Sequence, residues 1–164
     1  MTFQAELAQA KIPVQIDVGF GDAITPEPET VEYPVLLNAP PPKLRAYPVY
    51  TVIAEKFHAM VVLGEDNSRM KDFYDLWAIS RRFELDAALI AKAIAATFER
   101  RKTALPKRTP VALSPQFAES AAKQRQWEAF VRRSLLPADG VKLVQTQEAI
   151  AGLLLPALES LRKK

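Results

Sequence analysis

Cysteine is absent from the 164-residue sequence, and histidine occurs only once, at His58. The lack of cysteine excludes disulfide bonds and thiolate metal sites, and it is typical of proteins from a reducing compartment. A lone histidine is not a metal site without other ligands. We therefore interpret His58 as a structural residue.

Long apolar runs are also missing. No stretch reaches the length that spans a bilayer, and the N-terminus lacks the basic segment followed by an apolar segment that is typical of a secretory signal. We expect a soluble, cytoplasmic protein without membrane contacts. The apolar fraction of 49% is sufficient for the core of one compact domain, or of one domain plus an appended helical part.

The two parts of the chain carry opposite net charge. Residues 1–91 contain 8 basic and 13 acidic side chains, whereas residues 92–164 contain 14 basic and 6 acidic ones. A basic C-terminal part can attract the phosphate backbone of a nucleic acid. Scattered Lys and Arg side chains also simply solvate helix surfaces, so the sequence leaves both interpretations open.

The N-terminal part of the chain shows strand patterns and many prolines. Residues 14–20 alternate apolar and polar side chains, which predicts a half-buried strand with Asp17 on its polar face. More than half of the thirteen prolines fall at residues 25–48. Because proline lacks a backbone donor, only edge strands are expected there. The two predicted edge strands cover residues 31–37 and 44–47.

After the proline-rich part, the apolar spacing becomes helical. The predicted helices cover residues 52–60, 69–77, 86–102, 114–137 and 150–161. Asp86 and Ser114 are expected N-caps, and Pro115 follows at a first helical position. Asp139-Gly140 predicts a turn, and Pro156 predicts a kink or a break in the last helix.

These patterns predict an α+β protein, in which a small proline-rich β portion precedes a mainly helical domain. We divide the chain into strands at 1–48, a helical part at 49–104 and C-terminal helices at 112–164. Two or three strands with one exposed face rarely stand alone. We therefore expect the strand edge to find a partner, most simply a second copy of the chain in a homodimer.

Two charged motifs lie on the first two predicted helices. The first is Ile53-Ala54-Glu55-Lys56, and the second, some fifteen residues later, is Arg69-x-Lys71-Asp72-x-x-Asp75-Leu76. Within the second motif each acid follows a base by three or four residues, so the two share a helix face. Taken alone, such residues are surface ion pairs of small energetic value.

In order and spacing, the two motifs resemble the third and fourth motifs of the AbiEii/AbiGii toxin-type nucleotidyltransferases, which belong to the DNA polymerase β superfamily. The first two family motifs are absent: the chain contains no Gly-Gly-Ser or Gly-Gly-Thr, and no pair of acids spaced one apart on a predicted strand. The resemblance is strongest at residues 53–76. It implies the C-terminal portion of such an enzyme, with the last strands of the nucleotidyltransferase core followed by a helical domain.

The resemblance also implies roles for individual residues. The implied nucleotide-binding residues are Lys56, Glu55 and Arg69, with Glu55 supporting Lys56. Lys71 would contact phosphate, and Asp72 would act as the base on the acceptor hydroxyl. Asp17 fits the position of a third metal-binding carboxylate, and an exposed strand acid without that role is the alternative.

The function implied by the resemblance is Mg²⁺-dependent transfer of nucleotides from an NTP to an acceptor, which is RNA in some systems, by a bacterial toxin with an antitoxin partner. We expect the chain alone to be inactive and to bind Mg²⁺ weakly, because the paired carboxylates are missing. The alternative is a degenerate, non-catalytic remnant that acts as an interaction or RNA-binding module.

The family roles carry two structural expectations. The tips of Lys56, Lys71 and Asp72 should converge on one groove near the strand that carries Asp17. Surface substitutions away from special features usually change the free energy of unfolding by about 0.5 kcal/mol or less. Replacing Lys71 or Asp72 by alanine is therefore expected to leave folding nearly intact.

Overall fold

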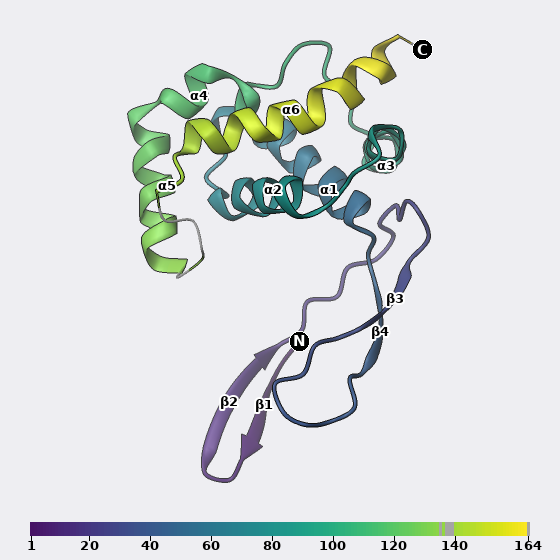
Figure 1. Cartoon of the computed structure of the whole chain (residues 1–164), viewed down its shortest axis with the longest axis vertical. Helices are drawn as coiled ribbons and strands as arrows, with labels where there is room; N and C mark the ends of the chain where they lie inside the picture. Colours follow the sequence, from purple (N-terminus) through teal and green to yellow (C-terminus); the bar gives the residue numbers. More distant parts are fainter. Residues whose placement is uncertain (135, 137–139, 164) are drawn as a thin grey trace.

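The computed structural model describes residues 1–134, 136 and 140–163. These residues form an α+β fold, as the sequence predicts, with two short sheets followed by a helical body (Figure 1). The strands are β1 (Thr2–Leu7), β2 (Ala10–Gln15), β3 (Glu29–Glu32) and β4 (Lys43–Ala46). The α-helices are α1 (Val49–Leu63), α2 (Met70–Arg82), α3 (Ala87–Arg100), α4 (Pro115–Glu119), α5 (Ala121–Ser134) and α6 (Leu143–Arg162). Short 3₁₀ helices form at Gly64–Asp66 and Val111–Leu113.

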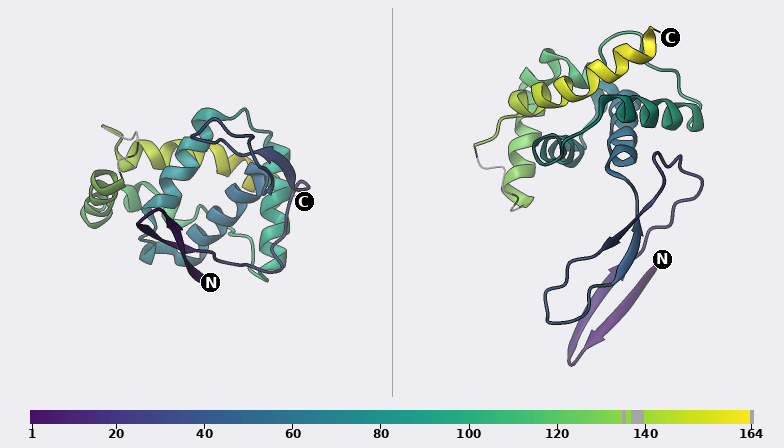
Figure 2. Two further views of the ribbon diagram at one scale, coloured as in Figure 1. Left: turned by 90° about the horizontal axis from the view of Figure 1, so that it is seen from below. Right: turned by 45° about the vertical axis from the view of Figure 1, so that its right-hand side comes forward.

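Both sheets are antiparallel hairpins that project from one side of the helical body (Figure 2). β1 pairs with β2, and β3 pairs with β4. Apolar side chains on these strands stay exposed to solvent, with Phe3 49% exposed and Ile12 46% exposed. The hairpins therefore rely on their own cross-strand pairs rather than on a shared core.

The strand predicted at residues 14–20 is wrong in its bounds. β2 ends at Gln15, and residues 16–20 form no strand. The alternation predicted a face in contact with a covering layer, but Phe20 on that face is 89% exposed. Without a layer to bury them, the alternating apolar residues do not extend the hairpin.

The second hairpin agrees better with the sequence. The strand predicted at residues 44–47 is confirmed, within one residue at each end, as β4. The strand predicted at residues 31–37 is only partly correct, because β3 stops at Glu32. Pro34 follows two residues later, and its missing N–H cannot continue a hydrogen-bonded ladder.

The helices share one hydrophobic core. α1 packs against α3, and α6 crosses both α2 and α3 (Figure 1). The Phe57 and Phe98 rings lie 5.7 Å apart and join α1 to α3, while Phe73 stacks on Phe117 at 5.4 Å and joins α2 to α4. This packing fixes α1 and α2 relative to each other, and with them the two charged motifs.

Both predicted N-caps are confirmed. The Ala88 N–H donates to Asp86 Oδ1 at 2.7 Å, which caps α3. The Phe117 N–H donates to Ser114 Oγ at 3.3 Å, and Pro115 occupies the first position of α4. These caps satisfy backbone donors that the first helical turn leaves without partners.

The helix predicted at residues 114–137 is two helices instead. α4 ends at Glu119, and the next residue, Ser120, has backbone angles of −57° and 124° that are not helical. α5 begins directly after it, at Ala121. Serine favours such breaks because its hydroxyl competes for backbone hydrogen bonds. The predicted helix end near Pro137 and the first residue of the Asp139-Gly140 turn lie outside the described residues.

α6 runs through Pro156 without ending, although the sequence predicted a kink or a break there. Pro156 is exposed, while Leu154, Ala157 and Leu158 on either side of it are buried in the core. Their packing holds the helix across the missing N–H. No helix in the described part of the chain is both long and apolar enough to cross a membrane.

Candidate functional site

The loop between α1 and α2 determines where the second motif begins. Gly64 follows α1 with a positive φ of 51°, which glycine adopts without steric cost. Asn67 is fully buried, and its Oδ1 accepts the Arg69 N–H at 2.9 Å. The Asn67 carbonyl accepts a hydrogen bond from Lys123 Nζ of α5, also at 2.9 Å. The start of α2 is therefore held by contacts with the loop and with α5.

Lys56 on α1 joins the two motifs. Its Nζ lies 2.7 Å from Asp72 Oδ1 and 2.7 Å from Asp75 Oδ2, both on α2. The Asp72 side chain is only 4% exposed and that of Lys56 17%. Burial alone would lower the pKa of Lys56, but its hydrogen bonds to Asp72 and Asp75 outweigh burial and raise that pKa above the usual value. Lys56 is therefore held in its charged form.

The other two bases of the second motif pair within α2, as their spacing predicts. Lys71 Nζ lies 2.6 Å from Asp75 Oδ2, and Arg69 Nε lies 2.8 Å from Asp72 Oδ2. Arg69 Nε and Asp72 Oδ2 form an ion pair that lacks the geometry of a hydrogen bond. The buried Asp72 Oδ2 therefore accepts no hydrogen bond. That oxygen keeps an unused acceptor position beside a cation.

Glu55 belongs to a second cluster, centred on Arg101 at the end of α3. Arg101 Nη2 lies 2.8 Å from Glu55 Oε2 and 3.1 Å from Asp22 Oδ1. The Tyr47 hydroxyl donates to the other oxygen of Asp22 at 3.4 Å. Glu55 thus pairs with Arg101, whereas the family resemblance implied that it supports Lys56.

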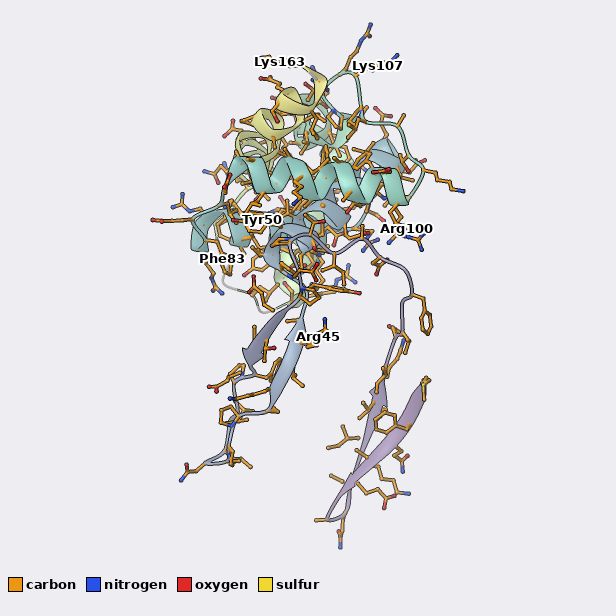
Figure 3. The ribbon with its side chains drawn as sticks, turned by 90° about the vertical axis from the view of Figure 1, so that its right-hand side faces the viewer. Arg45, Tyr50, Phe83, Arg100, Lys107 and Lys163 are labelled. Atoms are coloured by element: carbon orange, nitrogen blue, oxygen red, sulfur yellow. The ribbon has the colours of Figure 1, made fainter. Side chains whose placement is uncertain are left out.

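Further contacts attach the segment after the first hairpin to the helical body. The Thr25 N–H donates to Thr51 Oγ1 at 2.9 Å, and Thr51 Oγ1 donates to the Thr25 carbonyl at 3.0 Å. Arg100 donates to the Gly21 carbonyl. Figure 3 shows Arg100 at the edge of the helical body, beside the segment that leads to the first hairpin. These bonds place Asp22 next to α1 and α3.

The two clusters border one groove, of about 490 Å³, which we call the Lys56 groove. It is lined by Asp22, Tyr47, Thr51, Val52, Glu55, Lys56, His58, Ala59, Arg69 and Arg101. Three of these side chains are cationic and two are acidic. The groove therefore brings together three cations, from α1, the start of α2 and the end of α3, each of which is also paired with an acid.

His58 takes part in the packing beside this groove. Its Nε2 lies 2.8 Å from Thr103 Oγ1, and its ring meets the Phe98 ring edge-on at 5.1 Å. Burial lowers the pKa of His58 below its usual value. A neutral, packed imidazole agrees with the structural role expected from the sequence.

Three of the residues expected at one groove do not line it. Asp17 is exposed, accepts a hydrogen bond from Gln15 at 2.8 Å, and does not line the Lys56 groove. Lys71 Nζ contacts Asp75 Oδ2, the oxygen that Lys56 Nζ also contacts, but Lys71 lines a different groove, against α5. Asp72 contacts Lys56 at 2.7 Å, but it is buried and does not line the groove either. The predicted convergence on one groove is therefore wrong for Lys71, Asp72 and Asp17.

Sequence reasoning missed two residues of the site, Asp22 and Arg101. In the sequence, Asp22 follows a glycine-containing bend, as a turn residue would, and Arg101 is one of three consecutive bases at a predicted helix C-terminus, so neither residue stands out. The two residues lie 79 positions apart in the chain.

The described residues do not form a magnesium site by themselves. They contain no group of three or more His, Cys, Asp or Glu side chains placed to hold a metal ion. At the Lys56 groove, Arg101 pairs with both Asp22 and Glu55, and Lys56 pairs with both Asp72 and Asp75. Mg²⁺ requires carboxylate oxygens that are not already held by cations, so this donor set does not fit it.

The family of the chain follows from comparison with known proteins. A family model described as nucleotidyl transferase AbiEii toxin, type IV TA system, matches residues 1–151. No curated protein and no solved structure matches the chain. The match includes both charged motifs and every residue that lines the Lys56 groove, and it confirms the family predicted from those motifs: the chain belongs to the AbiEii nucleotidyl transferase toxins of type IV toxin–antitoxin systems.

Proposed function

We propose that the Lys56 groove binds the phosphates of an NTP, and that the chain takes part in nucleotidyl transfer to an RNA acceptor in the cytoplasm, under the control of an antitoxin. The observation that supports this proposal is the arrangement of three cations, Lys56, Arg69 and Arg101, around one groove. Two of them, Lys56 and Arg69, contact the buried carboxylate of Asp72. Phosphoryl chemistry depends chiefly on positioning and on electrostatic stabilisation, and clustered cations provide both.

Lys56 and Arg69 are the proposed phosphate contacts. A lysine ammonium has three donors, and Asp72 and Asp75 use two of those on Lys56, so one remains for a phosphate oxygen. Arg69 is 59% exposed, and its guanidinium has further N–H groups besides the one facing Asp72. Glu55 would act indirectly, by holding Arg101 at the groove.

Asp72 is the proposed base. Its Oδ2 is buried beside Arg69 and accepts no hydrogen bond. Once Arg69 moves from this oxygen to a phosphate, the oxygen would accept the proton of the acceptor hydroxyl as that hydroxyl attacks the nucleotide. Lys71 would contact a phosphate of the acceptor rather than of the NTP, because it lines the groove against α5. Asp17 would act as a metal ligand only within a set of carboxylates completed by another polypeptide.

Photocrosslinking tests the location of the nucleotide. Under irradiation with 4-thio-UTP or 8-azido-ATP, the chain should be labelled in the peptide around Lys56 or in the one around Arg69, and excess unlabelled NTP should prevent labelling. Labelling that maps only to α5 or α6, or that excess NTP does not reduce, would contradict the proposal.

The second candidate is a non-catalytic module that binds a partner or RNA. It is favoured by the pairing of all four acids near the groove with cations, which leaves no magnesium site among the described residues. Under both candidates the isolated chain should not transfer nucleotides. Robust Mg²⁺-dependent labelling of bulk tRNA from labelled NTPs, abolished by Asp17→Ala, would show that the chain alone is an enzyme with Asp17 as a ligand.

A further inference from the structure

A second groove lies between the start of α2 and one face of α5, and we call it the α2–α5 groove. Its volume is about 740 Å³. It is lined by Ser68, Arg69, Met70, Lys71, Ala122, Arg125, Gln126, Ala129, Phe130, Arg133 and Ser134. Four of these side chains are cationic and none is acidic. The groove is therefore a basic surface distinct from the mixed-charge Lys56 groove.

The charges on α5 are not neutralised within the described part of the chain. Arg69 and Lys71 each pair with an acid of α2, but no described carboxylate lies within 4.0 Å of Arg125 or Arg133. Both arginines are exposed. Guanidinium groups can bind phosphate through two N–H groups at once, so unpaired arginines in a groove are suited to phosphate.

The cations are spread along the groove rather than gathered at one point. Arg125 and Arg133 are eight residues apart on α5, which places them on one face and about 12 Å apart along the helix axis. A nucleic acid strand presents its phosphates in a row, and the half-buried Phe130 between the two arginines offers a ring on which a base can stack.

Arg69 belongs to both grooves. Its position relative to α5 is fixed, because Lys123 of α5 donates to the carbonyl of Asn67, while Asn67 Oδ1 accepts the Arg69 N–H. A nucleic acid strand that lies along α5 therefore reaches the Lys56 groove at Arg69, beside Asp72. This continuity favours RNA over an acidic protein, which would have no reason to end at that point.

We propose that the α2–α5 groove binds the phosphodiester backbone of single-stranded RNA and leads its end to Arg69. The inference rests on the proposed function only in taking RNA as the acceptor. Each phosphate contact with a single strand contributes about −0.7 to the slope of log K against log salt concentration. Arg125 and Arg133 should therefore account for about 1.4 of the slope that the whole chain shows.

The test is fluorescence anisotropy of the full chain with a labelled single-stranded RNA of about 12 nucleotides, without NTP, over a range of salt concentrations. Arg125→Gln/Arg133→Gln should weaken binding for every RNA sequence tried and reduce the salt slope by about 1.4. The matched control is Lys107→Gln/Arg108→Gln, which removes the same charge from exposed residues outside the groove and should leave the slope unchanged. Figure 3 shows Lys107 at the end of the helical body opposite the hairpins.

Two further variants keep the test independent of folding. Ala122→Glu places an acid in the groove at an exposed position and should also weaken binding, whereas Arg125→Lys/Arg133→Lys should keep most of the salt slope. An unchanged slope in Arg125→Gln/Arg133→Gln would overturn the proposal, and so would the absence of RNA binding by the wild-type chain.

Competition distinguishes the other occupants of the groove. If free NTP or polyglutamate displaces the RNA as effectively as unlabelled RNA does, the groove takes a triphosphate or an acidic protein, and the proposal is wrong. Because the direct RNA titration contains no NTP, RNA binding can fail while crosslinking at the Lys56 groove succeeds, or the reverse. The two proposals can therefore fail separately.

Discussion

Lys56 Nζ on α1 lies 2.7 Å from Asp72 Oδ1 on α2, and the Asp72 side chain is only 4% exposed. This ion pair connects the two motifs across the loop that separates them. It also changes the expectation that Asp72 can be removed without an effect on folding, because Asp72 is not a surface residue. Removing one member of a buried pair leaves the other charge without its partner.

The first prediction concerns stability. Asp72→Asn should lower the free energy of unfolding by about 2 kcal/mol, because Lys56 then keeps only Asp75 as an anionic partner. Urea unfolding of the two proteins measures the difference. Glu84→Gln is the control, since Glu84 is exposed and should change the value by about 0.5 kcal/mol or less. If Asp72→Asn and Glu84→Gln change the free energy of unfolding by the same small amount, the Lys56–Asp72 pair does not stabilise the fold.

The second prediction concerns pH. Burial alone would raise the pKa of Asp75, but the hydrogen bonds from Lys56 and Lys71 outweigh it and lower that pKa below 3.8. Since the folded pKa is lower than the unfolded one, the stabilisation is complete above pH 3.8 and is lost as the pH falls through the folded pKa. The pKa of Lys56 is shifted in the opposite direction, upwards. The stabilisation that the charged Lys56 contributes is therefore complete below pH 10.5 and is lost as the pH rises through the folded pKa.

Urea unfolding at a series of pH values compares wild type with Asp75→Asn. The wild-type protein should be more stable at neutral pH, and the gap should narrow as the pH falls below 3.8. Other carboxylates contribute equally to both proteins, so the difference isolates Asp75. A gap that stays constant across the acid range would mean that Asp75 does not titrate as its contacts imply.

The sequence predicted the helical part of the site well and the rest poorly. The spacing within 69–76 predicted the Arg69–Asp72 and Lys71–Asp75 pairs, because helical neighbours are determined by the local period. Asp86 and Ser114 were predicted as caps for the same local reason. Asp22 could not be placed, because its position depends on contacts with residues far along the chain.

The third prediction concerns that long-range contact. Arg101→Gln removes the bonds to Asp22 and Glu55, so residues 21–25 should exchange their amide hydrogens faster, while peptides from α6 should be unchanged. Hydrogen exchange with mass spectrometry measures both regions in one experiment. Lys102→Gln, the neighbouring exposed base, is the control. Exchange that is equally slow in all three proteins would show that Arg101 does not hold the segment at the groove.

The fourth prediction concerns the hairpins. Phe3 and Ile12 are about half exposed on β1 and β2, and a two-stranded sheet has two open edges. We expect the chain to form homodimers through these strands, with a mass that rises with concentration in multi-angle light scattering. Phe3→Lys/Ile12→Lys should shift the protein towards the monomer. A wild-type protein that is monomeric throughout the micromolar range would contradict this expectation.

The central claim is that the Lys56 groove binds nucleotide, and equilibrium titration tests it most directly. ATP, GTP, CTP and UTP are titrated separately into the full chain by calorimetry in the presence of Mg²⁺. We expect at least one to bind, and Arg69→Gln and Lys56→Gln each to weaken that binding by about 10-fold or more, as the loss of a hydrogen bond to a charged group implies. Lys92→Gln, an exposed base on α3, should have no effect. No binding of any of the four NTPs, or binding that both Lys56→Gln and Arg69→Gln leave unchanged, would contradict the claim.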